Sequence, residues 1–431
     1  MSEQVIHRYW RALLTLVLCF TVSAVFADEP YIANIRFEGN AKTKPSILLQ
    51  EMVIKVGDPV DDAKIETSRQ NILNLGLFKA VTADVIGEGP DKELLISVKE
   101  RYFILPLPLL DVRPDGTYSY GIDLHNDNLF GLNQRLKISY EDKRSIDVNG
   151  EPAKAVAVDY DYPHIVGTPY SLGMHLKLSR EDVNGEEDGY PNTFYELSND
   201  SYSLNVSRWL NETGTSSGWY SGLGFVINRR EYTYVSGLQS VYIDGLLLSG
   251  EASLGYKNIK DNVYYRSGTQ YGYRLSLGLP QMGSDFSYNS NLLFYRRYLP
   301  LDVNKANLNS QFRIGLANGS TFGNQVYNVG GYDTVRGYDS GSGRGNALFL
   351  ANIEYLHQIS GFNQLRAMLF TDIGNAWPEV KEMSLDDVHA SLGAGLRWRV
   401  LSFVDLHLSL ESAYNLESEN WTTYFNTSGS F

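Results

Sequence analysis

Cysteine is almost missing from this sequence, because Cys19 is the only one. It lies in residues 1–27, where two arginines precede an apolar run and Ala27 ends a site of the kind that signal peptidase cuts. We therefore expect residues 1–27 to be a secretory signal peptide, since the run is short for a membrane anchor. The chain that remains would then have no disulfide, thiol chemistry or cysteine-based metal site.

Long hydrophobic runs and positive charge are also scarce. No later stretch of about eighteen apolar residues exists, so the sequence predicts no membrane-spanning helix. Acidic residues outnumber basic ones by 50 to 37, and the net charge of −13 argues against nucleic acid as a partner. Two classes remain: a soluble exported protein, and a membrane β-barrel, whose hydropathy signal is weak.

Residues 28–101 form a unit distinct from the rest of the chain. The segment 31–37 alternates like a strand, and Pro45 opens a short helical stretch. A second helix is predicted after Asp61, followed by two alternating strands, "LFKAVTADVI" and "ELLISVKE". The predicted order is β-α-α-β-β. This small α+β unit resembles a POTRA domain, the periplasmic module of outer-membrane assembly proteins.

From Phe103 onward, hydrophobic residues recur at every second position. In "LGMHLKL", residues 172–178, leucine and methionine alternate with Gly173, His175 and Lys177. A soluble sandwich with one wet face also alternates. These strands, however, are longer than usual and end in tyrosine or tryptophan, as a membrane barrel requires. Because lipid cannot satisfy an open sheet edge, the strands must close on themselves.

The strand count predicts a mainly β fold, a 16-stranded antiparallel transmembrane barrel over residues 102–431. The first strand is expected at about 103–112 and the last at 421–431. Short turns such as "PHIVGT" alternate with long loops, which are expected at 181–199, 233–243 and 318–345. Both ends of the barrel therefore face the periplasm.

The loop at 318–345 carries an arginine among many glycines. Glycine permits the tight turns with which such a loop can fold back into a barrel. In the two strands that follow, the alternation places Glu354 and Asp372 inside the lumen. Two confined carboxylates repel each other, and an arginine between them relieves the repulsion. We therefore expect Arg336 to reach inward to both.

These residues carry a second resemblance. "VRGY" (335–338), the glutamate of "NIEY" and "FTDIG" are similar to the signature of the BamA/TamA superfamily, the bacterial surface antigen family. The resemblance implies that the sixth outer loop enters the barrel and that its arginine pairs with wall acids. For this chain the resemblance implies an ion network of Arg336, Glu354 and Asp372, a loop tip of Val335, Gly337 and Tyr338, and lumen support from Phe370 and Gly374. A purely structural role for this network, stiffening the barrel without any transport function, is the alternative.

Two prolines mark the first barrel strand. Pro106 and Pro108 are two positions apart, so their missing N–H groups would lie on the same edge. If that edge meets the last strand, which contains Phe425 and ends at Phe431, the closing seam lacks two ladder bonds. The resemblance implies a lateral seam for client strands here. The alternative is that the prolines only end the linker from the POTRA-like unit.

The resemblance implies assembly or translocation of polypeptides in the outer membrane of a Gram-negative bacterium. Its implied partners are the bilayer, unfolded or exported polypeptides, and periplasmic or lipoprotein accessory subunits, with no cofactor and no metal. A dedicated secretion transporter and a porin-like structural barrel are alternatives. An outer-membrane hydrolase is a third, although HExxH does not occur and we expect no enzymatic activity.

Overall fold

The computed structural model describes residues 29–112, 117–145, 152–185, 190–211, 216–262, 265–302, 305–400 and 406–426. The expected signal peptide and Phe431 lie outside the described residues. None of the described helices is long and apolar enough to cross a lipid bilayer.

The N-terminal unit is a three-stranded sheet with two helices, in the order β1 (Tyr31–Glu38), α2 (Pro45–Gln50), α3 (Asp62–Asn74), β2 (Phe78–Ile86) and β3 (Asp91–Glu100). The central strand β3 runs parallel to β1 and antiparallel to β2. The Asp61 carboxylate caps α3 by accepting hydrogen bonds from the backbone N–H groups of Ala63 and Lys64. Ile47, Ile72 and Leu94 are fully buried between helices and sheet. The predicted β-α-α-β-β order is confirmed.

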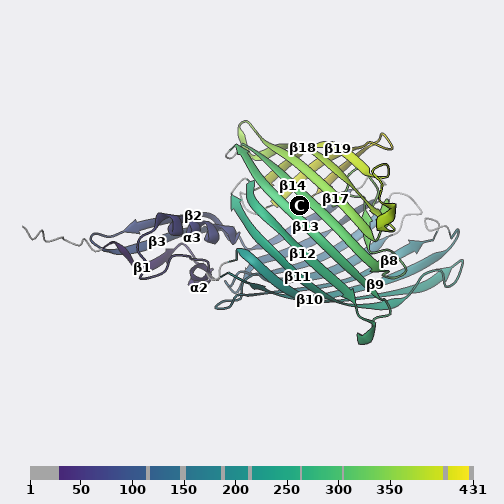
Figure 1. Cartoon of the computed structure of the whole chain (residues 1–431), viewed down its shortest axis with the longest axis horizontal. Coiled ribbons are helices and arrows are strands. Elements are labelled where there is room, and N and C mark those ends of the chain that lie inside the picture. The colour runs from purple at the N-terminus through teal and green to yellow at the C-terminus, as the bar shows by residue number, and fades with distance from the viewer. Residues whose placement is uncertain are drawn as a thin grey trace, which may run out of the picture.

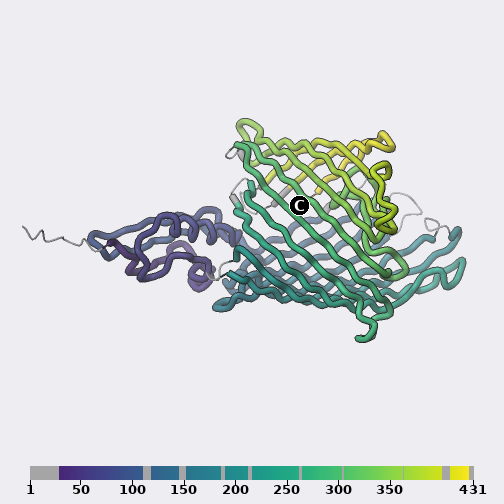
Figure 2. The backbone as a smooth tube through the Cα atoms, viewed as in Figure 1, coloured from purple at the N-terminus to yellow at the C-terminus, as the bar shows by residue number. Residues whose placement is uncertain are grey.

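Sixteen strands form one closed antiparallel barrel, which confirms the predicted fold class (Figures 1 and 2). They are β4 (Ile104–Val112), β5 (Thr117–Leu129), β6 (Gln134–Ser145), β7 (Ala153–Tyr162), β8 (Tyr170–Asn184), β9 (Phe194–Trp209), β10 (Gly218–Ser236), β11 (Gly245–Asn262), β12 (Tyr265–Gly278), β13 (Tyr288–Asp302), β14 (Ala306–Gly319), β17 (Ala347–Ile359), β18 (Phe362–Trp377), β19 (His389–Val400), β20 (Leu406–Asn415) and β21 (Trp421–Asn426). Two short 3₁₀ turns lie at Pro280–Met282 and Val380–Glu382.

The segment between β14 and β17 contains its own small sheet. Strand β15 (Tyr327–Val329) pairs with β16 (Gly343–Gly345), so the two arms of this loop lie together. Val329, Val335 and Tyr338 of the loop pack against Leu350 of β17 and Ala376 of β18. The loop is therefore held against the barrel wall by an apolar contact as well as by polar ones.

Two of the predicted outer loops are shorter than expected. Strand β8 continues to Asn184, β9 begins at Phe194 and β10 continues to Ser236, so much of 181–199 and part of 233–243 are strand. The polar residues there suggested loops, but a strand that leaves the bilayer needs no apolar face. Its backbone groups are still satisfied by the neighbouring strands.

The N-terminal unit contacts the barrel at one end (Figure 1). The backbone N–H of Lys44 donates to the carbonyl of Gly131 at 2.9 Å, and Asn128 Nδ2 donates to Thr43 Oγ1 at 2.9 Å. Gly131 has a φ of +72°, and a Cβ there would meet the Lys42 carbonyl oxygen at 2.2 Å. Only glycine permits this close approach of the two backbones.

A buried polar cluster completes this docking. The Glu51 carboxylate contacts His164 Nδ1 at 2.7 Å and accepts hydrogen bonds from Ser216 Oγ at 2.9 Å and Ser216 N at 3.1 Å. Glu51 and His164 are only 1% and 2% exposed. Because a buried carboxylate is costly without partners, this cluster fixes the unit to the turns between β7 and β8 and between β9 and β10.

Candidate functional site

Arg336 lies inside the barrel and donates to carboxylates from three different strands. Its Nε and Nη2 donate to Asp372 Oδ2 and Oδ1 at 2.6 and 2.8 Å, which is a bidentate pair. Its Nη1 donates to Glu354 Oε1 at 3.0 Å and to Glu411 Oε2 at 2.8 Å. The backbone N–H of Arg336 also donates to Asp372 Oδ2, at 3.2 Å.

All four of these residues are inaccessible to solvent. Arg336 is 1% exposed, and Glu354, Asp372 and Glu411 are 0% exposed. The alternation of β17 explains part of this arrangement, since Leu350, Asn352 and Glu354 are buried on the same face. The cross-strand register then aligns Asn352 with Asp372 on β18. Charges are thus brought together by strand parity and register, not by sequence proximity.

A second guanidinium, that of Arg397 on β19, shares the same acids. Its Nη1 and Nη2 donate to Glu354 Oε2 and Oε1, each at 3.2 Å, and Nη2 donates to Glu411 Oε1 at 3.1 Å. Two cations therefore face three carboxylates, which leaves this set one negative charge in excess. The hydroxyl of Tyr332 donates to Glu411 Oε1 at 3.2 Å and helps to compensate that acid.

The ring of Phe370 stacks against the guanidinium group of Arg336. The Arg336 Cζ atom lies 3.6 Å from the centre of the Phe370 ring, in cation–π geometry. Gly393 makes this possible, because a Cβ there would come within 2.1 Å of the ring. Gly374, the second predicted support residue, leaves room for β17 instead, since a Cβ there would meet the Phe349 carbonyl oxygen at 2.6 Å and Leu350 Cδ1 at 2.9 Å.

The loop tip is fixed by the last strands of the barrel. Gly337 donates its N–H to Tyr424 Oη at 2.9 Å, and its carbonyl accepts from Asn415 Nδ2 at 3.0 Å. The φ of Gly337 is +92°, a left-handed value that favours glycine. Tyr338 donates its hydroxyl to the carbonyl of Ala390 at 3.1 Å, and Val335 is fully buried.

The structure therefore brings together Arg336, Glu354 and Asp372, with Phe370 and the tip residues around them. Sequence reasoning missed Glu411 and Arg397. Both stand at lumen-facing positions of alternating segments, "LESAY" and "GAGLRWRV", so parity was an available signal. What parity could not give was the register that places them beside Glu354.

The prolines of β4 lie on the seam edge of that strand. Asp127 N donates to the carbonyl of Phe103 at 2.9 Å, and β4 pairs with β5 without a register shift. Alternate residues from Phe103 onward therefore bond to β5, and Pro106 and Pro108 fall between them. Their nitrogens therefore face the other edge of β4, the edge on which Val112 pairs with β21. In the described residues, that seam is paired at Phe425 and Val112.

Comparison with known protein families identifies both parts of the chain. Residues 128–410 match the Omp85 superfamily domain, and residues 30–101 match the POTRA family described as surface antigen variable number repeat. The chain belongs to the Omp85 superfamily, with a POTRA domain before its barrel.

Curated relatives are similar over most of this chain. The outer membrane protein assembly factor BamA of Nitratidesulfovibrio vulgaris is 23% identical over 399 residues, which are 86% of this chain and 47% of the relative. The BamA of Neisseria meningitidis is 23% identical over 400 residues, 83% of this chain and 48% of the relative. The chain thus spans about half the length of the curated relatives it matches.

Solved structures share the fold. CdiB from Escherichia coli superposes with a TM-score of 0.65 at 16% identity, over 92% of this chain and 76% of that one. CdiB from Acinetobacter baumannii gives 0.63 at 19% identity, over 92% of this chain and 73% of that one.

Proposed function

We propose that this chain assembles or translocates polypeptides in the outer membrane of a Gram-negative bacterium, with its POTRA domain in the periplasm. The observation that carries this proposal is the buried site of Arg336, Glu354, Asp372 and Glu411. The bound loop gives the lumen a fixed internal element. A machine that passes chains through its wall or lumen needs a fixed internal element while other parts move.

Two sheet edges, one in the POTRA domain and one at the barrel seam, could pair with a client strand and so favour the same function. The POTRA sheet has β1 and β2 as its outer strands, and an extended client can add to such an edge by backbone hydrogen bonds. At the barrel seam, Pro106 and Pro108 remove two donors from the edge of β4. In this proposal a client meets the POTRA edge first and the seam next. Accessory subunits in the periplasm would join through the same domain.

A dedicated secretion transporter is the second candidate. The loop site occupies the wall formed by β17–β20, whereas a cavity of about 460 Å³ lies against the wall formed by β4–β8. The residues lining that cavity include Asp123, Lys137, Asp159 and His175, which are charged or polar. A polar lumen beside the loop suits passage of a chain, and outer-membrane insertion does not require it.

The test is a deletion strain complemented with the native protein, R336A or the lipid-facing control R297Q. Outer-membrane and secreted proteins are then quantified by mass spectrometry. The proposal predicts loss of a defined set of polypeptides, restored by the native protein and R297Q but not by R336A at equal abundance. A depleted outer-membrane set indicates assembly, and a depleted secreted set indicates transport. Unchanged proteomes, together with large steady single-channel currents, would instead favour a porin.

A further inference from the structure

Five cations line the lumen wall of four consecutive strands, and we call this surface the cationic wall. It consists of Lys257 on β11, Arg266 and Arg274 on β12, Arg296 on β13 and Arg313 on β14. Register places them on one face: Lys257 is opposite Gln270, Gln270 is opposite Arg296, and Arg296 is opposite Gln311. The same row continues through Asn352 to Asp372 in the loop site, so it faces the lumen.

These cations have no ion pair with any other residue that the structure describes. Among the residues that the structure describes, none of the five has a carboxylate oxygen within 4.0 Å, whereas Arg336, Arg397 and Arg399 of the lumen all do. Arg313 is repelled by Arg296 and Arg274, and Lys257 is repelled by Arg135, Arg266 and Arg296. Three acids stand near the wall. Asp261 lies opposite Arg266 in the register of β11 and β12 but pairs with Arg399 at 3.3 Å. Asp333 of the loop attracts Arg313 from a distance, and Glu251 accepts from Ser276 Oγ at 3.2 Å.

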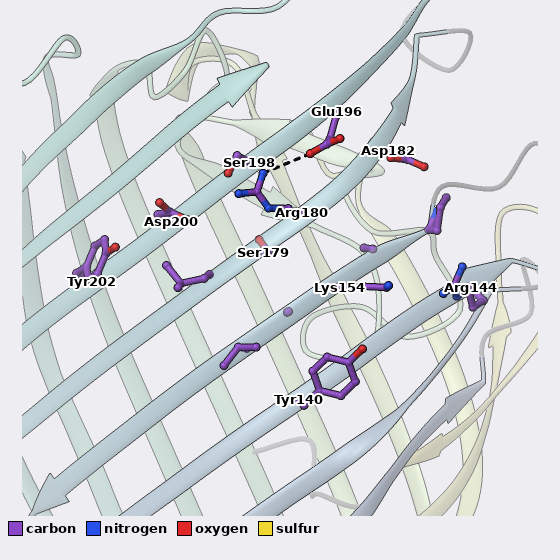
Figure 3. A pocket seen from close by; sticks show the side chains of 15 residues that line it. Tyr140, Arg144, Lys154, Ser179, Arg180, Asp182, Glu196, Ser198, Asp200 and Tyr202 are labelled. Carbon is purple, nitrogen blue, oxygen red and sulfur yellow. Dashed lines mark hydrogen bonds and ion pairs between the residues drawn. The ribbon is translucent and has the colours of Figure 1, made fainter. Parts of the chain in front are cut away.

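The outer wall of the barrel shows the opposite arrangement. Around the pocket in Figure 3, Arg180 pairs with Glu196 at 3.3 Å, and Arg144 pairs with Asp142 at 2.6 Å. Lys154 also lies 4.0 Å from Asp142. These three outer-wall cations have a carboxylate within 4.0 Å, whereas the five lumen cations have none among the described residues. Unpaired positive charge gathered on one face attracts negatively charged ligands.

Arg296 and Arg313 form the best-defined part of the wall. Arg296 Nε and Arg313 Nη2 both donate to Gln311 Oε1, at 2.6 and 3.1 Å, so one neutral oxygen holds two guanidinium groups together. Gln311 is 1% exposed, and its Nε2 donates to Asn352 Oδ1 at 3.3 Å. Asn352 Nδ2 in turn donates to Asp372 Oδ1 and to the carbonyl of Thr334 in the loop, at 2.8 and 2.6 Å. The wall is thus joined by hydrogen bonds to the site that holds Arg336.

The extent of the wall indicates the occupant. Arg266 and Arg274 are eight residues apart on one strand, which corresponds to roughly 27 Å at about 3.4 Å per residue. A single phosphate or lipid headgroup could reach one or two of these cations. An extended polypeptide with several carboxylates could meet them in succession. We propose that the cationic wall binds an acidic, extended segment of a polypeptide inside the lumen.

This inference rests on the proposed function and names the chemistry of the client. The direct test measures binding of a fluorescent glutamate-rich peptide to the full chain in nanodiscs, by polarisation at low salt. We expect the acidic peptide to bind and matched neutral and basic peptides not to bind. Binding should weaken as salt is raised, because screening shortens the range of these charges.

The double variant R296Q/R313Q should weaken acidic-peptide binding at least about tenfold, from the loss of two charge-assisted hydrogen bonds. The matched control is R297Q, because Arg297 follows Arg296 but points to the opposite face. K257Q and R274Q form a second test, since both side chains are exposed and their loss leaves no buried group unsatisfied.

A folded double variant with unchanged affinity, or equal binding of the three peptides, would overturn the inference. Competition by inorganic phosphate that matched the peptide would reassign the wall as a small-anion site and also overturn it.

The two proposals fail separately. If the deletion strain loses specific polypeptides but K257Q, R274Q and R296Q/R313Q bind acidic peptide normally, only the cationic wall is refuted. If the wall binds acidic peptide but no polypeptide is lost from the deletion strain, only the proposed function is refuted.

Discussion

Arg336 uses four of the five N–H groups of its guanidinium on three carboxylates. No other side chain has this geometry, because lysine offers one charged point instead of a planar fork. Because three carboxylates face only two guanidinium groups, removing either cation leaves buried carboxylates without compensating charge. Removing one acid can be tolerated if that acid accepts few hydrogen bonds.

R336A should be strongly destabilising. It leaves Glu354, Asp372 and Glu411 buried with Arg397 alone, and breaking a buried pair in this way costs about 3–5 kcal/mol. R336K should recover only part of that loss. The measurement is the temperature to which a sample must be heated before its fast-migrating folded band disappears from a gel. Equal midpoints for R336A and the native protein would mean that the arginine is not seated among the acids.

The three acids should not be equivalent. Asp372 accepts three hydrogen bonds from Arg336, and Glu411 accepts one. D372N should therefore destabilise the folded barrel more than E411Q, which also relieves the excess negative charge. In a double-mutant cycle, R336A and D372N should couple by more than about 1 kcal/mol, because they remove the same contact. Additive effects would argue against a direct pair.

At the scale of the element, β19 has no room for a side chain at Gly393, where it passes the Phe370 ring. G393A places a Cβ against the ring and should displace it from the Arg336 guanidinium, at a cost of about 1–3 kcal/mol from overpacking. The control is A394V, the next residue along, which is exposed on the other face. The same gel midpoint measures both. A stable G393A protein with an unstable A394V protein would be the contrary result.

The seam gives a prediction for β4. P106A/P108A returns two N–H donors to the edge that faces β21, so the seam should hold more tightly. We expect a higher unfolding midpoint and weaker complementation of the deletion strain. L107A is the control, since the N–H of Leu107 faces β5 instead. If the proline variant complements fully, opening of the seam is not needed for the function.

Sequence patterns predicted the strands themselves better than they predicted which residues of neighbouring strands lie side by side. Period-two alternation gave the barrel class and placed Glu354 and Asp372 inside, because that signal is local to each strand. The pairing of Glu411 with Arg336 depends on the registers of β18, β19 and β20, which no single strand encodes. The lengths of β8–β10 were underestimated for a similar reason, since polar strand ends look like loops.

At the scale of the whole molecule, the POTRA domain is docked and not merely tethered. Its contacts fall on the turns β5–β6, β7–β8 and β9–β10 and on the end of β11, far along the chain from α2 and α3, so sequence patterns did not predict them. Besides the cluster at Glu51, Asn74 Oδ1 accepts from Asp261 N at 2.9 Å. Under the proposed function, this docking would fix where a client bound at the POTRA edge lies relative to the barrel mouth.

Cysteine crosslinking can measure the docking. The side chains of Thr43 and Asn128 are in hydrogen-bond contact, so a short bifunctional thiol reagent should crosslink T43C/N128C in a C19S background in membranes. Adding E51A should reduce the yield, because Ser216 and His164 lose their buried partner. A control pair of T67C with N128C, with Thr67 exposed on α3, should not crosslink. Equal crosslinking of both pairs would indicate a freely moving domain.

The most direct test of the central claim is a side-chain-resolved cryo-electron microscopy map of the full chain in a lipid nanodisc. The account predicts that the Arg336 guanidinium lies within hydrogen-bond distance of Asp372, Glu354 and Glu411, over the Phe370 ring. A map in which the loop extends outside the barrel, with Arg336 in solvent and the three acids paired otherwise, would contradict it.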